Sequence, residues 1–447
     1  MKIVIVGAGG VGSQLAAQLI ADNKDVVIIE KNPDVAKHAS THLDCIVITG
    51  EGNNPKILRK AGIEKADFFL SVTDSDEVNM ISCALVASEF KVPNKIARVR
   101  NLDYSSIRNF EKVFLGIDFF VNPELEAARE IVASVMYGAS SDLMLFSNAN
   151  IQMRNIVISS TSFFKDKSLR EIKVSLKKDF LISCIVRQDK VIIPSGNTIV
   201  KENDNIYLVA TRNILEDVLS EFGRSSLVIK NIVIVGGGRI GRYTARYLME
   251  QHRNIKIIDS DYKNCKLLAE EFPKATVIHS DISDRDIFEE EQLYSYDLIV
   301  TTTNKQELNI LAAIYAKTFG IKRSIALVTR RNYLSIASNL GIDSIVSPKR
   351  STVDTVLKFI RKGNIKSIYS ILTGKAEVIE FSVNKNSPIT GKTIENIRLP
   401  DNTLILAVTR GFESYIPGGK FLIQEGDDII TITTKESVSE LEEIFNR

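Results

Sequence analysis

Short runs of apolar and β-branched residues alternate with stretches of helical periodicity over the first part of the chain. The apolar runs read KIVIV, DVVII, CIVI, DFFLSV and KIARV, and the stretch after Gly12 places Leu15, Ala16 and Leu19 on one side of a helix. Alternation of this kind is typical of a parallel sheet with helices on both faces. The pattern predicts an α/β fold with a Rossmann-like, doubly wound parallel sheet.

The pattern changes after about a third of the chain. Residues 165–211 read as alternating strands around an SGN turn with one short helical piece, which indicates a small α+β domain. The segment before it, PELEAAREIVASVM, carries Leu125, Ala128, Val132 and Val135 at helical spacing. Such a stripe usually packs into a core, although a helix that leaves a domain can also dock on a partner.

Both parts of this pattern occur twice. The glycine spacing of GAGGVG recurs in GGGRIG, and the acid that ends DVVIIE recurs at the end of IKIID, at the same distance from its turn. Residues 66–81 align with 296–311, and 165–211 resemble 390–434. The repeat predicts two Rossmann-like domains, each followed by a small α+β domain. The expected boundaries are 1–122 for the first Rossmann-like domain, 123–142 for a linker helix, 143–226 for the first small domain, 230–348 for the second Rossmann-like domain, 349–366 for a linker helix and 367–447 for the second small domain, with linkers at 138–150 and 361–367.

Composition narrows the class of protein. The formal net charge of +2, from 57 basic and 55 acidic residues, gives no sign of a nucleic-acid or membrane-surface partner. The four cysteines show no metal-ligand or disulfide spacing, and a reducing cytosol fits this cysteine usage best. His38 and His42 lie four apart on one helix, a spacing that can bind metal, but no third ligand is evident nearby, so we expect a solvated helix face and no metal. Uncharged stretches fall short of the ~18 residues that cross a bilayer, and Met1 leads directly into a strand, so we expect no signal peptide.

Each glycine turn follows a strand, opens a helix and precedes an acid about 20 residues later, which is the context of a dinucleotide-binding turn. The first glycine permits the tight turn, the second lets the backbone approach a pyrophosphate, and the third lets the helix lie close to the strand. The expected contacts are Gly7, Ala8, Gly9, Gly10, Val11 and Gly12 in the first copy and Gly236, Gly238, Arg239 and Gly241 in the second. The alternative is that one or both turns only pack a helix on a strand.

Acids after the second and third strands narrow the identity of the expected dinucleotide. Glu30 and Asp259 are placed to accept hydrogen bonds from a ribose diol, and a carboxylate there repels a 2′-phosphate. The sequence therefore predicts NAD rather than NADP. Glu51 and Asp281 follow the third strand of each copy, where each could reach a ribose or adenine, or cap the next helix.

The two copies differ at the carboxyl edge of the sheet, where ligands of open α/β sheets bind. The first copy has Thr73, Asp74, Arg98 and Arg100 at this edge, whereas the second has Thr303, Asn304, Leu327 and Thr329. If the two arginines contact phosphate, the sites differ in charge. The alternative for these arginines is a solvated strand end or an ion pair.

Several strings together carry a resemblance that covers the whole chain. They are GAGGVG with Glu30, VTDSDEVNM, ARVRN, GIDFFVNPE, GGGRIG with Asp259, VTTTNKQELNIL and GIDSIVSP. The chain resembles the regulatory subunits of Trk-type potassium uptake systems, a family built from tandem RCK or KTN domains. The resemblance implies a non-enzymatic cytoplasmic protein, peripheral on the inner face of the cell membrane. Such a protein forms a homo-oligomeric, tetrameric ring and gates a membrane potassium-translocating subunit of the TrkH or TrkG type according to bound NAD(H), or ATP or ADP in the same sites.

The resemblance also implies site residues. The family's nucleotide contacts fall on Gly7 through Val11, Glu30, Thr73, Asp74 and Arg98, with Arg100 as a further phosphate contact. In the second copy only the turn Gly236 to Gly241 and Asp259 match the pattern, because Leu327 stands where the first copy has an arginine.

Two other functions compete. An NAD-dependent oxidoreductase with two fused halves would need a residue positioned against the nicotinamide, yet each Rossmann-like part is followed by a small unit without a histidine or a carboxylate pair. A DNA-binding redox repressor would need a basic recognition helix, which the sequence lacks, so no nucleic-acid partner is expected.

Overall fold

The computed structural model forms two compact units, and each draws on both halves of the chain. The first unit comprises Met1–Ala139 and Ile229–Ile360, and the second comprises Ser140–Val228 and Arg361–Arg447. The structure describes residues 1–101, 114–136, 144–146, 150–188, 190–220, 229–360, 365–385 and 387–446. Most of the linkers expected at 138–150 and 361–367 lies outside these residues.

The first half contributes a parallel sheet of six strands in the order β3-β2-β1-β4-β5-β6. The strands are β1 (Lys2–Val6), β2 (Asp25–Glu30), β3 (Ile46–Thr49), β4 (Phe68–Ser71), β5 (Asn94–Arg98) and β6 (Phe119–Val121). The helices that connect them are α1 (Gly10–Ala21), α2 (Pro33–His42), α3 (Pro55–Lys60) and α4 (Asp76–Glu89), with a short 3₁₀ helix η1 (Ile63–Lys65). Side chains alternate along β1, so that Ile3 and Ile5 enter one core with Leu15, while Val4 and Val6 enter the core on the other face.

The second half repeats this sheet in the order β14-β13-β12-β15-β16-β17. Its strands are β12 (Asn231–Val235), β13 (Asn254–Asp259), β14 (Thr276–His279), β15 (Leu298–Thr301), β16 (Arg323–Leu327) and β17 (Ser344–Val346). Its helices are α9 (Arg239–Glu250), α10 (Tyr262–Glu271), α11 (Asp286–Glu290), α12 (Gln306–Thr318) and α13 (Arg331–Asn339), with η2 (Leu293–Ser295). In both sheets the order of strands reverses beside the first strand, and a crevice at such a point is where α/β sheets bind ligands.

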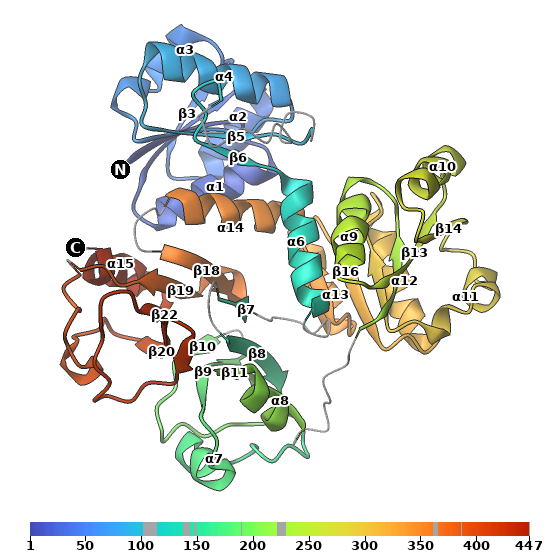
Figure 1. Cartoon of the computed structure of the whole chain (residues 1–447). Helices are drawn as coiled ribbons and strands as arrows, with labels where there is room; N and C mark the ends of the chain where they lie inside the picture. Colours follow the sequence, from blue (N-terminus) through green and yellow to red (C-terminus); the bar gives the residue numbers. More distant parts are fainter. Residues whose placement is uncertain are drawn as a thin grey trace. The chain divides into compact units, whose positions relative to one another are not determined.

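The two sheets exchange helices. Helix α6 (Pro123–Met136) follows the first sheet but packs on α9 of the second, and α14 (Pro348–Ile360) follows the second sheet but packs on α1 of the first (Figure 1). Val353, Val356 and Leu357 of α14 belong to the core that contains Leu15. Each Rossmann-like sheet is therefore covered in part by a helix from the other half of the chain.

The apolar stripe predicted on α6 is partly wrong. Ala128 and Val135 are buried as expected, but Leu125 and Val132 are only half-buried. The fully buried positions also include Ala127 and Ile131. The buried face is wider than a single stripe because α6 packs against both α9 and α14.

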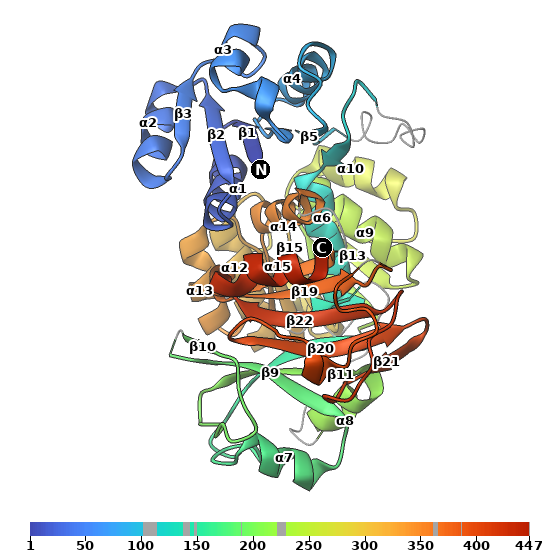
Figure 2. The same cartoon turned by 90° about the vertical axis from the view of Figure 1, so that its left-hand side faces the viewer.

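The second unit contains two antiparallel sheets of five strands, in the orders β10-β9-β11-β8-β7 and β18-β19-β22-β20-β21. Figure 2 shows β19, β22 and β20 side by side. The first sheet has β7 (Met144–Leu145), β8 (Ile151–Val157), β9 (Phe180–Arg187), β10 (Lys190–Ile192) and β11 (Asn205–Thr211), with α7 (Leu169–Leu176) and α8 (Arg212–Ser220). The second has β18 (Ile365–Ile371), β19 (Ala376–Ser382), β20 (Thr403–Arg410), β21 (Glu413–Tyr415) and β22 (Asp428–Thr434), with α15 (Val438–Asn446) and the 3₁₀ helices η3 (Leu372–Gly374), η4 (Ile394–Asn396) and η5 (Lys435–Ser437). Residues 365–367, expected in a linker, belong to β18 instead.

One core joins these two sheets. Met153 and Val209 of the first pack with Val378, Leu406 and Ile430 of the second. The helices lie on the other side of each sheet, where separate cores form. The small domains are therefore of the α+β type that the sequence predicts.

Candidate nucleotide sites

The first glycine turn links β1 to α1, and two of its glycines are required by the fold. Gly7 has a φ of +99°, which residues with a side chain rarely adopt. A Cβ on Gly12 would lie 1.9 Å from the carbonyl oxygen of Gly7. Gly9 differs, because a Cβ there would have no atom within 4 Å. The space beside Gly9 is open, as the approach of a ligand to the backbone requires.

The start of α1 is built to accept an anion. Its N-cap residue is Gly9, which has no side chain to cap the helix, and the first turn of α1 carries no acidic residue. The first N–H groups of a helix have no partner within the helix, and the helix dipole is positive at this end. Ala8 and Val11 are buried beside the turn, while Gly9 and Gly10 are exposed. The turn therefore fits a pyrophosphate.

Glu30 ends β2 and reaches back to the turn. One carboxylate oxygen accepts a hydrogen bond from the N–H of Ala8 at 2.7 Å, and the other accepts one from the N–H of Asn32 at 2.9 Å. Each oxygen keeps a further lone pair. The carboxylate is thus held beside the turn and can still accept hydrogen bonds from hydroxyl groups.

The acids after the third strands do not cap the following helices. Glu51 is exposed, and the side chain of Asn54 caps α3 by accepting from the N–H of Lys56 at 2.9 Å. Asp281 accepts from the N–H and the hydroxyl of Ser283 at 2.9 and 2.8 Å, which closes a turn ahead of α11. These two bonds hold the pKa of the Asp281 carboxyl below its usual value. The helix-cap interpretation is therefore wrong in both copies.

The carboxyl edge of β4 and β5 brings the four predicted residues together. Arg98 donates to the carbonyl oxygen of Thr73 at 3.3 Å and to the carboxylate of Asp74 at 3.0 Å. Arg100 donates to the carbonyl oxygen of Asp74. The side chain of Arg98 is 14% exposed, whereas that of Asp74 is 93% exposed. An ion pair with so exposed a carboxylate is weak, so an incoming phosphate could replace it.

Asn79 holds this edge in place, a role that the sequence analysis missed. Its side-chain oxygen accepts from the N–H and hydroxyl of Thr73 at 2.9 and 2.7 Å, and its amide donates to the carbonyl of Arg98 at 2.8 Å. Asn309 makes the same bonds to Thr303 and to the carbonyl of Leu327. The match of Asn79 to Asn309 in the alignment of residues 66–81 with 296–311 was the available signal.

The second glycine turn has the same backbone. Gly236 has a φ of +97°, a Cβ on Gly241 would lie 2.0 Å from the oxygen of Gly236, and a Cβ on Gly238 would meet nothing within 4 Å. Asp259 accepts from the N–H of Gly237 at 2.7 Å, as Glu30 does from Ala8.

The side chains around the second turn differ from those around the first. Arg242 donates to Glu271 and to the oxygen of Asn264, both at 2.6 Å, and the amide of Asn264 donates to Asp259 at 3.0 Å. The corresponding residues of the first copy are Ser13, His42 and Val35. Arg242 is thus bonded to Glu271 and Asn264, and Asp259 is bonded to the same Asn264. Leu327 is buried where Arg98 stands in the first copy.

Comparison with known proteins decides the family. A family model described as the TrkA-N domain matches residues 3–123 and again 232–348, and one described as the TrkA-C domain matches 153–223 and 378–446. The chain belongs to the TrkA family. Among its TrkA relatives, the Trk system potassium uptake protein TrkA homolog 1 of Methanosarcina mazei is 34% identical over the whole of both chains. The Trk system potassium uptake protein TrkA of Halomonas elongata is 30% identical over all of this chain and 98% of the relative.

Solved structures agree on the fold of this TrkA-family chain. A structure titled "Crystal Structure of the GsuK RCK domain" superposes with a TM-score of 0.58 and 19% identity, over 99% of this chain and 94% of that one. A structure titled "GsuK channel bound to NAD" superposes with a TM-score of 0.58 and 19% identity, over 99% of this chain and 78% of that one. The predicted fold of two Rossmann-like domains, each with a small α+β domain, is confirmed.

Two kinds of feature are absent from the described residues of this TrkA-family chain. No helix there has the length and apolar character needed to cross a bilayer. No group of three or more histidine, cysteine, aspartate or glutamate residues in that part of the chain is placed to hold a metal ion.

Proposed function

We propose that this TrkA-family chain is the nucleotide-sensing regulatory subunit of a Trk-type potassium uptake system. The observation that carries the proposal is full-length membership of a family named for Trk potassium uptake, in a chain whose first glycine turn leaves open space beside Gly9. In this proposal a nucleotide bound at the Rossmann-like domains changes the activity of a membrane subunit.

The proposed ligand of the first site is NAD(H), with ATP or ADP as alternatives in the same place. The position of Glu30 supports a ribose diol at the second strand. The solved relatives in fold include one titled as bound to NAD and one titled as bound to ADP. The proposed contacts are Gly7, Ala8, Gly9, Gly10, Val11, Gly12, Glu30, Glu51, Thr73, Asp74, Arg98 and Arg100.

The second site is proposed to bind nucleotide less well. Its contacts would be Gly236, Gly238, Arg239, Gly241, Asp259 and Asp281. The backbone supports binding there, but Asp259 already accepts a hydrogen bond from Asn264. In addition, the buried Leu327 stands where the first copy has Arg98.

The proposed partner is an integral membrane potassium-translocating subunit of the TrkH or TrkG type. We propose that four copies of this chain form a ring on the cytoplasmic face of the membrane and act there as a peripheral subunit. The chain's four-domain organisation supports a role in which binding in one domain moves its neighbours. A ligand can shift such an equilibrium only by its differential affinity for the two states.

Potassium uptake tests the proposal directly. In a strain that lacks other potassium systems, deletion of this chain should abolish uptake through the membrane subunit. The wild-type chain should restore it, and a Gly9→Val variant should not. Unchanged uptake after deletion would refute the regulatory role. Oxidation of NADH by the purified chain with any of a panel of carbonyl substrates would favour the oxidoreductase alternative instead.

A further inference from the structure

The N-terminus of α1 faces a cation that comes from the other half of the chain. A Cβ built on Gly10 would lie 2.6 Å from Nζ of Lys349. Lys349 is the second residue of α14, the helix that packs on α1 through Val353 and Leu357. The exchange of helices thus places an ammonium group at the end of α1 where the helix dipole is positive and an anion is expected.

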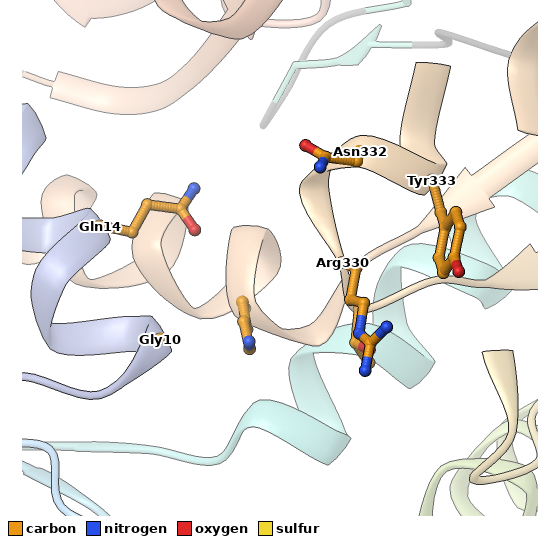
Figure 3. A pocket seen from close by; sticks show the side chains of 7 residues that line it. Gly10, Gln14, Arg330, Asn332 and Tyr333 are labelled. Atoms are coloured by element: carbon orange, nitrogen blue, oxygen red, sulfur yellow. The ribbon is translucent and has the colours of Figure 1, made fainter. Parts of the chain in front are cut away.

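A cavity of about 490 Å³ opens at this point. Gly10 and Gln14 of α1 lie on one side, and Arg330, Asn332 and Tyr333 of the second half lie on the other (Figure 3). Thr329 and Lys349 complete its lining, which contains two cations and no carboxylate. Neither of those two cationic side chains has an ion pair or hydrogen bond with a residue that the structure describes. The cavity therefore offers uncompensated positive charge beside an anion-binding helix end.

The second glycine turn is flanked in the same way by a helix from the other half, but there an ion pair takes the place of the single cation. Arg239 occupies the position of Gly10, and Glu124 of α6 occupies the position of Lys349. The two side chains lie 3.7 Å apart, and Glu124 is 19% exposed. The N-terminus of α9 thus has the carboxylate of Glu124 beside it, whereas the equivalent position beside α1 is held by Lys349.

We propose that Lys349 and Arg330 complete the first nucleotide site by binding the phosphates of a nucleoside diphosphate held at the N-terminus of α1. The inference rests on the proposed function and adds residues of the second half to that site. The diphosphate is the shared chemistry of NAD(H) and of ADP or ATP. Ammonium and guanidinium groups form strong charge-assisted hydrogen bonds to phosphate oxygens.

Lys349 also connects the site to the contact between the exchanged helices. The next residue, Arg350, donates to Glu130 of α6 at 2.8 Å, and Ser351 donates to the same carboxylate at 2.5 Å. Thr355 donates to Glu126 of α6 at 3.0 Å. A phosphate that fixes Lys349 therefore restrains the first turn of α14, which holds α6. Ligand binding and the α6–α14 contact are thermodynamically linked through this turn.

Titration calorimetry on the full chain tests the proposal with ADP, NADH and adenosine. Lys349→Gln and Arg330→Gln should each weaken ADP and NADH about tenfold, the order expected for one charged hydrogen bond. Adenosine, which has no phosphate, should bind each variant as it binds wild type. Lys349→Arg should retain most of the affinity. The matched control is Lys358→Gln, an exposed lysine of the same helix, which should change nothing.

The outcomes separate this inference from the proposed function. If wild type binds neither ADP nor NADH, both fall together. If wild type binds but Lys349→Gln and Arg330→Gln bind equally well, only the inference falls. An equal loss for adenosine would also overturn it, because that result indicates a structural role for the two residues. Thermal unfolding of each variant alongside wild type verifies that it is folded.

Discussion

The two glycine turns have nearly the same backbone and very different surroundings. Gly7 and Gly236 share a positive φ, and Gly12 and Gly241 leave the same lack of room for a side chain. Around the first turn, Glu30 and Lys349 supply the charges, and Ser13, Val35 and His42 stand at the positions of the second copy's network. Around the second stands a network of Arg242, Asn264 and Glu271. The backbone is kept by the packing of helix on sheet, so a glycine motif alone does not establish binding.

The comparison gives the glycines two separate functions. The first and third allow the helix to lie on the strand, and they are needed whether or not a ligand binds. The second faces open space in both copies, so only a ligand would require it. Substitutions at these positions should therefore separate folding from binding.

Gly12→Val should have the largest effect. The new Cβ would overlap the carbonyl oxygen of Gly7, and backbone in a buried turn cannot move away cheaply. We expect a loss of about 3 kcal/mol in the free energy of unfolding of the first unit. Denaturant unfolding of the full chain measures it, and Gly241→Val is the matched change in the second copy. A denaturation midpoint equal to wild type would show that the turn relaxes.

Gly9→Val should leave stability nearly unchanged and remove nucleotide binding from the first site. No atom lies within 4 Å of the new Cβ, so the side chain fills only the space proposed for phosphate. We expect at least a hundredfold loss of NADH affinity in calorimetry, about 2.7 kcal/mol. Gly238→Val is the control and should leave first-site binding intact. Equal affinity of Gly9→Val and wild type would show that the ligand binds elsewhere.

Glu30→Gln should weaken NADH about tenfold and reduce the preference for NADH over NADPH. The amide oxygen can still accept from the N–H of Ala8, so the bond to the turn remains, whereas the NH₂ group loses the bond from the N–H of Asn32. The charge that repels a 2′-phosphate is gone. The ratio of the two Kd values measures the effect. Glu30→Ala is a poorer test because it leaves the N–H of Ala8 without its partner, which costs about 1 kcal/mol. A ratio that does not change would argue against a ribose at Glu30.

Arg98→Leu should have the smallest effect, and it makes the first site resemble the second, where Leu327 stands. We expect ADP affinity to fall between threefold and tenfold, about 0.7–1.4 kcal/mol, with a change in stability below about 1 kcal/mol, because the pair with exposed Asp74 contributes little. The loss should shrink at high salt. Wild-type affinity in the variant would mean that Arg98 serves only its ion pair.

Local patterns in the sequence were sufficient to predict the two parallel sheets, the two glycine turns and the positions of Glu30 and Asp259 beside those turns. Each of these patterns depends on residues close together in the chain, as in KIVIV, the glycine spacing and the acid at the end of DVVIIE. The repeat shows each pattern a second time, which strengthens the prediction. The substitution of Leu327 for an arginine was also visible by aligning the copies.

Contacts between distant segments were not predictable in this way. Nothing near Glu130 indicates that Arg350 will meet it, because the exchange of α6 and α14 depends on how two domains pack. The network that ties Arg242 to Glu271 was missed for the same reason, since its members belong to different helices. Nothing in the sequence around Lys349 indicates that its side chain lies against Gly10.

The exchange of α6 and α14 also bears on how such a chain can change over time. A protein with a single repeat could exchange these helices only with an identical copy, so every substitution in one site would appear in the other. In this chain the partner of each half is always the other half. Lys349 beside Gly10 and Glu124 beside Arg239 show that the equivalent positions of α14 and α6 carry opposite charges. Fusion of two repeats therefore lets the two sites carry different side chains at equivalent positions.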